Sequence, residues 1–121
     1  MDTPEPPVLD PAVFDRLRRI GGEPLVKRMI DTFMGYAPGQ MEVITTSTRS
    51  GEADVAGNAA HSLKSSAGNI GAMGLFALCL EVEQAGRKGD MDNLPALAAE
   101  LAVVFEQVCS HLASLVEQEG T

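Results

Sequence analysis

The most informative segment of this sequence is Ala60-His61-Ser62-Leu63-Lys64-Ser65-Ser66-Ala67-Gly68-Asn69-Ile70-Gly71-Ala72. Successive residues of an α-helix are rotated by about 100°, so a helix here places a histidine among small and polar residues on one side. That side carries Asp54, Gly57, Asn58, His61, Lys64, Ser65, Gly68 and Ala72. The opposite side is apolar and predicted to be buried, with Val55, Ala59, Leu63, Ala67 and Ile70. Solvent-facing helix surfaces usually hold long charged side chains. The short neighbours of the histidine therefore predict that another protein's surface can approach the imidazole.

The same stretch resembles the signature of histidine-containing phosphotransfer (HPt) domains, the phosphate-carrying modules of phosphorelays. The signature combines a histidine, a lysine three residues later, small residues and a Gly-Ala pair, here His61, Lys64, Ser65 and Gly71-Ala72. The family usually has glycine at position 65, and serine is small enough that we expect access to His61 to be kept. The resemblance covers almost the whole chain, including Leu9-Asp10, Phe33, Gly51-Glu52, Leu75, Leu78, Cys79, Val82-Glu83 and the run 85–90.

This resemblance implies that the protein carries phosphate. His61 would accept a phosphoryl group from the aspartyl phosphate of a response-regulator receiver domain and donate it to a second receiver. The ring nitrogen farther from the backbone would hold the phosphoryl group. Lys64, one turn from His61, would offset the negative charge of the phosphoryl oxygens. The docking face around His61 would consist of Asn58, Ser65, Gly68 and Asn69.

The expected partners follow from the same implication. They are receiver domains and a hybrid histidine kinase, with neither nucleic acid nor membrane, and the module is expected to be a monomer. The sequence shows no carboxylate cluster for Mg²⁺ and no metal-ligand spacing, so the receiver would supply Mg²⁺ with its aspartate. Because a glycine-rich nucleotide loop is also missing, we expect neither kinase nor ATPase activity.

Composition and helix signals predict an all-α fold. Of the 121 residues, 45% are hydrophobic but only 4% are aromatic and none is Trp, which suits closely packed helices. A disordered tail is expected at 1–8, and Asp10 with Pro11 predicts the start of a short helix. Its apolar positions are Phe14, Leu17 and Ile20, and Gly21-Gly22 is expected to end it.

The rest of the chain predicts four longer helices. One runs over about 23–49 and is expected to kink near Pro38, because proline removes a helix hydrogen bond. The histidine helix spans 52–71, a third begins at Leu75 and ends at 86–89, and Asp92 or Asn93 caps the last. The last helix has the clearest stripe, with Leu97, Leu101, Val104, Phe105, Val108, Leu112, Leu115 and Val116. The expected architecture is an antiparallel four-helix bundle with a short additional N-terminal helix, in a single domain over 9–118.

Charge and the ends of the chain limit the class of partner. A net charge of −8 argues against a general binder of nucleic acid or of anionic membranes. The N-terminus is acidic and Pro-rich without a following apolar segment, and no stretch approaches the roughly 20 apolar residues of a membrane span. The cytoplasm is therefore the expected location. Cys79 and Cys109 lie in apolar helical patterns and are predicted to be buried, reduced thiols.

Three further polar residues have weaker cases. Asn69 either hydrogen-bonds near the site or simply favours a helix end. Glu83 is explained equally well as a solvated carboxylate and as a contact of the site. His111 has neither a lysine three residues later nor small neighbours, and is predicted to be an ordinary histidine at the edge of the core.

Other classes of protein fit less well. A di-iron bundle needs Glu-x-x-His pairs, whereas Asn58 stands three residues before His61, and Glu106 and His111 are five apart. The phosphoacceptor region of a histidine kinase would need an ATP-binding domain, which the sequence does not contain. The open alternative is an HPt-like module that docks a receiver or kinase without carrying phosphate. Ser65 is the local reason to consider it, and phosphate labelling of His61 would separate the two.

Overall fold

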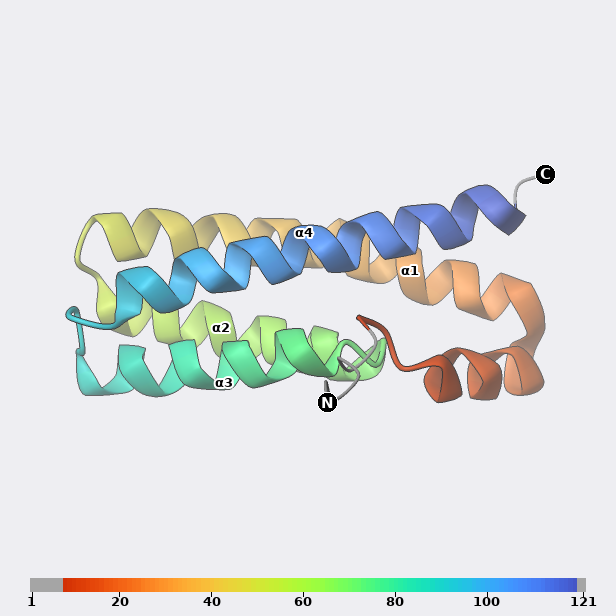
Figure 1. Ribbon diagram of the computed structural model, residues 1–121, viewed down its shortest axis with the longest axis horizontal. Coiled ribbons are helices and arrows are strands. Elements are labelled where there is room, and N and C mark those ends of the chain that lie inside the picture. Colours follow the sequence, from red (N-terminus) through yellow and green to blue (C-terminus); the bar gives the residue numbers. More distant parts are fainter. Residues whose placement is uncertain (1–7, 120–121) are drawn as a thin grey trace, which may run out of the picture.

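The computed structural model describes residues 8–119, which form four antiparallel helices (Figure 1). They are α1 (Pro11–Arg49), α2 (Ala53–Asn69), α3 (Met73–Lys88) and α4 (Leu94–Glu119). Each helix packs against its neighbours around the bundle, and the described residues include no strand. The predicted all-α bundle is therefore confirmed. The tail expected at 1–8 falls mostly outside the described residues, and its last residue, Val8, is half-buried against the core.

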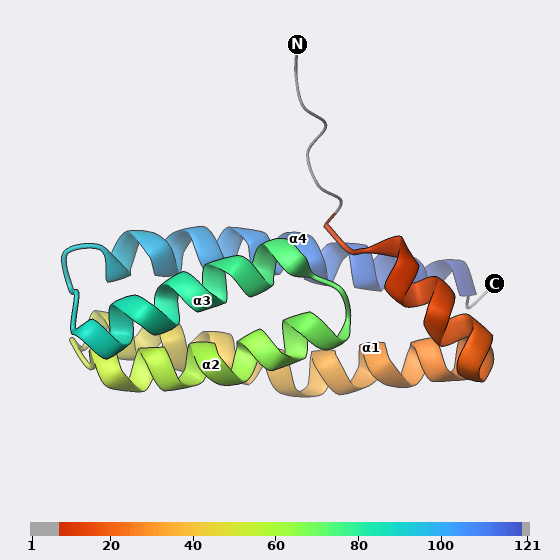
Figure 2. The same cartoon turned by 90° about the horizontal axis from the view of Figure 1, so that it is seen from below.

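The short N-terminal helix is the first part of α1, which bends sharply at Gly22 (Figures 1 and 2). Gly22 has φ 67°, a left-handed conformation that favours glycine. The Asp10 carboxylate caps this first segment by accepting the backbone N–H of Ala12 at 3.0 Å. The backbone N–H of Asp10 donates to the carbonyl of Gly71 at 2.9 Å, which ties the start of α1 to the α2–α3 turn. The break expected at Gly21-Gly22 is therefore confirmed, whereas the backbone stays helical at Pro38, where a further kink was expected.

The core is built mainly from aliphatic side chains, as the composition predicts. The largest fully buried residues are Val26, Ile44, Leu63, Ile70, Leu75, Cys79, Val82, Leu94, Leu101, Val108 and Leu112. Ile20 (71%) and Val55 (38%), which were predicted to face the core, are exposed. Ile20 stands next to the bend of α1. Val55 is exposed because α2 packs against both α1 and α3, and the buried arc that results includes Ala56 and leaves Val55 outside.

The histidine side of α2 is also less open than the helix geometry predicts. Gly57 and Ala72 were both expected on that side, but both are buried. Gly57 lies against the backbone of α3, and Ala72 lies in the core just before α3 begins. Gly57 is buried because α3 as well as α1 covers α2, and Ala72 lies beyond the end of α2 at Asn69, where the α2 pattern no longer applies.

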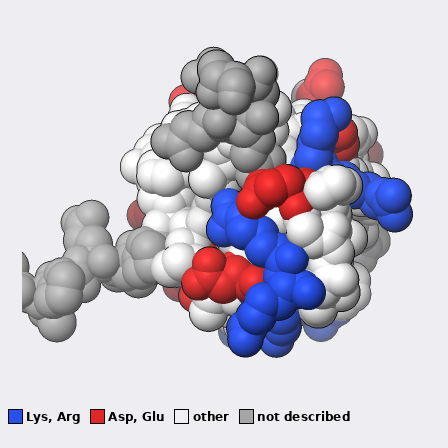
Figure 3. Space-filling view, turned by 90° about the vertical axis from the view of Figure 1, so that its right-hand side faces the viewer, with Lys and Arg blue, Asp and Glu red and all other residues white. Residues whose placement is uncertain are grey.

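Charged residues gather at the end of the molecule where α1 bends (Figure 3). Five of the nine Lys and Arg residues lie between 16 and 28. Acidic residues alternate with them, and ion pairs join Arg18 to Glu23 at 2.7 Å and Lys27 to Asp31 at 3.5 Å. This end is therefore a mixed charged surface and not a uniformly basic one.

Helix α4 contains a longer apolar segment than expected from the sequence. The segment Leu94–Val116 is long and apolar enough, by length and composition alone, to cross a membrane. Its stripe Leu101, Phe105, Val108 and Leu112 is buried in the bundle, while 28% of the apolar segment is buried overall. The earlier expectation that no stretch comes near this composition was wrong.

The two cysteines are both free. Cys79 is buried as predicted, and burial is the main reason why the pKa of its thiol rises to about 12. Cys109 is only half-buried, and burial with the nearby charge of Glu106 raises the pKa of its thiol too. Raised thiol pKa values fit unreactive cysteines, since the thiolate is the reactive form.

Candidate functional site

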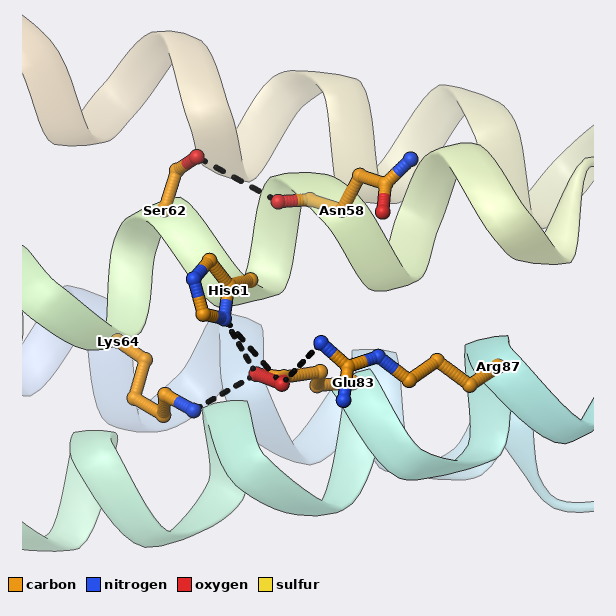
Figure 4. A network of polar contacts seen from close by, with 6 residues as sticks. All are labelled: Asn58, His61, Ser62, Lys64, Glu83 and Arg87. Atoms are coloured by element: carbon orange, nitrogen blue, oxygen red, sulfur yellow. Dashed lines mark hydrogen bonds and ion pairs between the residues drawn. The ribbon is translucent and has the colours of Figure 1, made fainter.

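His61 stands at the middle of α2, on the side that faces α3 (Figure 4). Its side chain is 56% exposed, so a partner can reach the ring. The α2 residues beside it are small, which lets the two helices come close together. Ala60 is buried at the core side, and Gly57, one turn earlier, contacts the backbone of α3.

A buried carboxylate from α3 holds the histidine ring. Nδ1 of His61 lies 3.2 Å from Oε1 and 3.1 Å from Oε2 of Glu83. The Glu83 side chain is only 4% exposed. Burying an isolated carboxylate is costly unless it is paired and hydrogen-bonded, so this position calls for several donors.

Two positively charged side chains, Lys64 and Arg87, are the other partners of the Glu83 carboxylate. Nζ of Lys64 lies 2.8 Å from Oε2 of Glu83, and a guanidinium nitrogen of Arg87 lies 3.0 Å from Oε1. Burial acts to raise the pKa of the Glu83 carboxyl, but the hydrogen bonds from Lys64 and His61 and the charges of Lys64 and Arg87 lower it. The lowering contributions win, and the pKa of Glu83 lies below its ordinary value. Glu83 is therefore ionised at neutral pH.

The ionised Glu83 carboxylate next to Nδ1 determines which ring nitrogen of His61 carries the proton when the imidazole is neutral. A carboxylate only accepts hydrogen bonds, so Nδ1 must carry the proton that it donates to Glu83. The lone pair of the neutral imidazole is then on Nε2. The outer nitrogen is thereby left as the nucleophilic atom of an exposed ring.

Of the predicted site residues, Lys64 lies in the Glu83 cluster with His61, and Asn58 and Ser65 lie on the exposed surface beside it. Lys64 joins His61 through their shared partner Glu83. Asn58 and Ser65 are exposed, one turn before and one turn after His61, and the Asn58 side chain points away from the ring (Figure 4). The backbone carbonyl of Asn58 accepts the Ser62 hydroxyl at 3.4 Å.

The other two predicted residues lie toward the end of α2. Gly68 is half-buried, and a Cβ there would be 3.5 Å from the Phe76 ring of α3. Asn69 is exposed at the last position of α2. It borders a small hollow of about 80 Å³ between α1 and α2, to which Met29 and Tyr36 also contribute. Neither residue touches His61 directly.

Sequence reasoning missed the central role of Glu83 and did not single out Arg87 at all. A signal for Glu83 was present in the spacing of α3. Leu75, Cys79 and Val82 are buried at positions i, i+4 and i+7, and Glu83 continues that stripe at i+8. A carboxylate in a buried stripe predicts a charged partner, but the sequence of α3 does not tell which residue of α2 it meets.

The other histidine has no comparable surroundings. Nδ1 of His111 lies 2.9 Å from the carbonyl of Gln107 in its own helix, and the side chain is exposed. Over the part of the chain that the structure describes, no group of three or more His, Cys, Asp or Glu residues could hold a metal ion.

Comparisons with known proteins identify the family and the fold. The sequence profile of the Hpt domain matches residues 28–118. Histidine-containing phosphotransfer protein B of Pseudomonas aeruginosa has a similar structure, with a TM-score of 0.85 and 24% sequence identity over 94% of this chain and 98% of that chain. A search of curated protein sequences finds no match. Since the profile covers three quarters of the chain, including His61, Lys64 and Glu83, the protein belongs to the family of histidine-containing phosphotransfer domains.

Proposed function

We propose that Nε2 of His61 accepts a phosphoryl group from the aspartyl phosphate of a receiver domain and passes it to the aspartate of another. Proteins of this family are phosphocarriers of phosphorelays and are not kinases. The observation that supports His61 as the carrier is the contact of Nδ1 with buried Glu83, which in a neutral ring places the proton on Nδ1 and the lone pair on Nε2 of an exposed side chain.

The proposed step is a direct displacement at phosphorus. The Nε2 lone pair forms a bond to phosphorus while the bond from phosphorus to the aspartyl oxygen breaks and leaves a carboxylate on the receiver. The imidazole becomes positively charged as it bonds to phosphorus, because Nδ1 keeps its proton. The Glu83 carboxylate stabilises that charge from 3.1 Å away. Such transfers depend mainly on positioning and charge stabilisation.

Lys64 and Arg87 supply positive charge for the phosphoryl oxygens. They lie on opposite sides of Glu83 and flank the ring of His61 (Figure 4). Two cations against one carboxylate leave a net positive charge in this cluster. The charge is close to the place where the dianionic group arrives, and Coulomb attraction at such short range is large.

The docking face that we propose around His61 comprises Asn58, Ser65, Gly68 and Asn69. Proteins of the family interact with receiver domains and kinases, and we infer that a receiver brings Mg²⁺ with its aspartate. A hybrid histidine kinase would supply the phosphate. We place this exchange in the cytoplasm, between a monomer of this chain and its partners, without nucleic acid or membrane.

The test is a transfer assay with a phosphorylated receiver domain and Mg²⁺. Wild type should acquire acid-labile, base-stable phosphate, and His61→Gln should acquire none. His111→Gln is the matched control, since His111 is exposed and is hydrogen-bonded to Gln107 in its own helix, and it should be labelled like wild type. Labelling of His61→Gln would show that another residue is the acceptor. Binding of a cognate receiver without labelling of any form would show a docking module.

A further inference from the structure

Helices α2 and α3 touch through two glycines, Gly57 and Gly86. A Cβ built on Gly86 would lie 2.6 Å from the carbonyl oxygen of Ala53 and 2.6 Å from Cα of Gly57. A Cβ on Gly57 would lie 3.2 Å from the carbonyl oxygen of Glu83. Neither glycine has a positive φ, so the backbone conformation does not require glycine at either position. Glycine is required at both positions because the two helix backbones approach each other so closely.

This contact lies one helical turn from the site. The two helices are antiparallel, with His61 four residues after Gly57 and Glu83 three residues before Gly86. The next layer of the same interface, about 5.4 Å along the helix axis, therefore pairs His61 with Glu83. We propose that Gly57 and Gly86 are positioning residues that set the α2–α3 separation at which Glu83 reaches Nδ1 of His61.

The distances show how little separation is tolerated. An ordinary contact of a Cβ begins at 3.4 Å, so an alanine at position 86 would push the backbones apart by about 0.8 Å from 2.6 Å. The same shift at the next layer would stretch the Nδ1–Oε2 distance from 3.1 Å to almost 4 Å, which is beyond hydrogen-bond range. Arg87, four residues after Glu83 on the same helix, holds the buried carboxylate on the α3 side, whereas Lys64 lies on α2 and would move away together with His61. The half-exposed ring of His61 belongs to α2 and would move away with that helix.

The contact between Gly57 and Gly86 therefore controls which tautomer the neutral ring of His61 adopts. With Glu83 in reach, Nδ1 keeps the proton and Nε2 is free. Without it, the ring is released to the other tautomer, in which Nε2 carries the proton and is no longer a nucleophile. The effect on phosphate transfer rests on the proposed function, whereas the effect on the tautomer does not.

The test measures the His61 tautomer directly, by ¹⁵N NMR of the unphosphorylated protein in a His111→Gln background. Wild type should show mainly the form protonated at Nδ1. Gly86→Ala should lower the fraction of this form at least two-fold, and Gly57→Ala, whose closest contact is longer, should lower it less. Gly74→Ala is the matched control in the same helix, because a Cβ there meets nothing within 4 Å, and it should leave the tautomer unchanged.

Two outcomes separate positioning from simple loss of stability. A folded Gly86→Ala protein with the wild-type tautomer ratio would overturn the proposal, even if its melting temperature fell. If Gly86→Ala does not fold, Gly57→Ala decides the matter in the same way. The tautomer measurement uses no phosphate, so a wild-type protein that fails to accept phosphate would refute the proposed function and leave this result standing.

Discussion

At the scale of single residues, Glu83 organises the site although it is not expected to contact the phosphoryl group. It accepts hydrogen bonds from His61 and Lys64, forms an ion pair with Arg87, and is almost fully buried. An ion pair of exposed side chains is worth little, but a buried carboxylate that loses a partner is costly. Removing any one of these three partners is therefore expected to destabilise the buried Glu83 carboxylate.

Lys64 is expected to contribute to transfer and not to docking. Lys64→Ala should slow transfer from a phosphorylated receiver by about 10-fold, less than the loss of a fully buried oxyanion donor. Receiver binding should be unchanged, because the lysine side chain is only 18% exposed. Rates measured under single-turnover conditions, beside a separate binding titration, check both statements. Lys88→Ala is the matched control, since Lys88 is exposed at the end of α3 and outside the Glu83 cluster. Equal rates for the two variants would remove the role assigned to Lys64.

At the scale of helices, the last turns of α1 show how polar residues are accommodated in the bundle. The hydroxyls of Thr45 and Thr46 donate to backbone carbonyls four residues earlier, both at 3.0 Å. The Thr48 hydroxyl is buried and has no hydrogen-bond partner among the described residues. A buried polar group without a partner destabilises the folded state.

Thr48→Val should therefore stabilise the protein. Valine keeps the shape and removes the unpartnered hydroxyl, so the free energy of unfolding should rise by about 1 kcal/mol. Thr45→Val removes a hydroxyl that is hydrogen-bonded, and it should give no gain or a small loss. Urea unfolding of the two variants against wild type measures the difference. A Thr48→Val protein less stable than Thr45→Val would mean that the hydroxyl of Thr48 is satisfied in solution.

At the scale of the whole molecule, one aliphatic core supports an exposed site on one side of the bundle. Leu101 of α4 is fully buried in this core, on a different helix from those that carry His61 and Glu83. Leu101→Ala should lower the free energy of unfolding by about 2–5 kcal/mol, through lost burial and the cavity left behind. The matched control is Val103→Ala, whose side chain is 59% exposed. Chemical denaturation measures both, and similar small losses would contradict the assignment of Leu101 to the core.

The buried carboxylate should also shape the acid stability of the bundle. Because the pKa of Glu83 is lower in the folded chain than its ordinary value of 4.5, its contribution to stability is complete above about pH 4.5. It is lost as the pH falls through the folded-state pKa. At pH 7, Glu83→Gln should be less stable than wild type by about 2 kcal/mol. This difference in stability should shrink as the pH is lowered to about 3. Urea unfolding of both proteins at a series of pH values between 7 and about 3 measures it. A difference that does not change with pH would show that the Glu83 charge is not the cause.

Much of this protein could be read from its sequence because helical periodicity is a local property. The spacing of apolar residues in the last helix predicted the buried stripe of α4, and Asp10 with Pro11 predicted the start of α1. The small residues around His61 marked α2 as the helix that carries the site. Such patterns need only the geometry of one helix, and they remain valid whatever that helix packs against.

The interhelical contacts could not be obtained in this way. Which residue of α3 meets His61 depends on the register and separation of two helices, and these result from packing across the whole bundle. Glu83 was therefore equally compatible with solvent and with the site, and Gly57 was assigned to an open surface that α3 covers. Local sequence patterns were enough to predict the helices and to single out His61 with Lys64. The buried carboxylate and the glycine contact became visible in the folded chain alone, because both are properties of the α2–α3 interface.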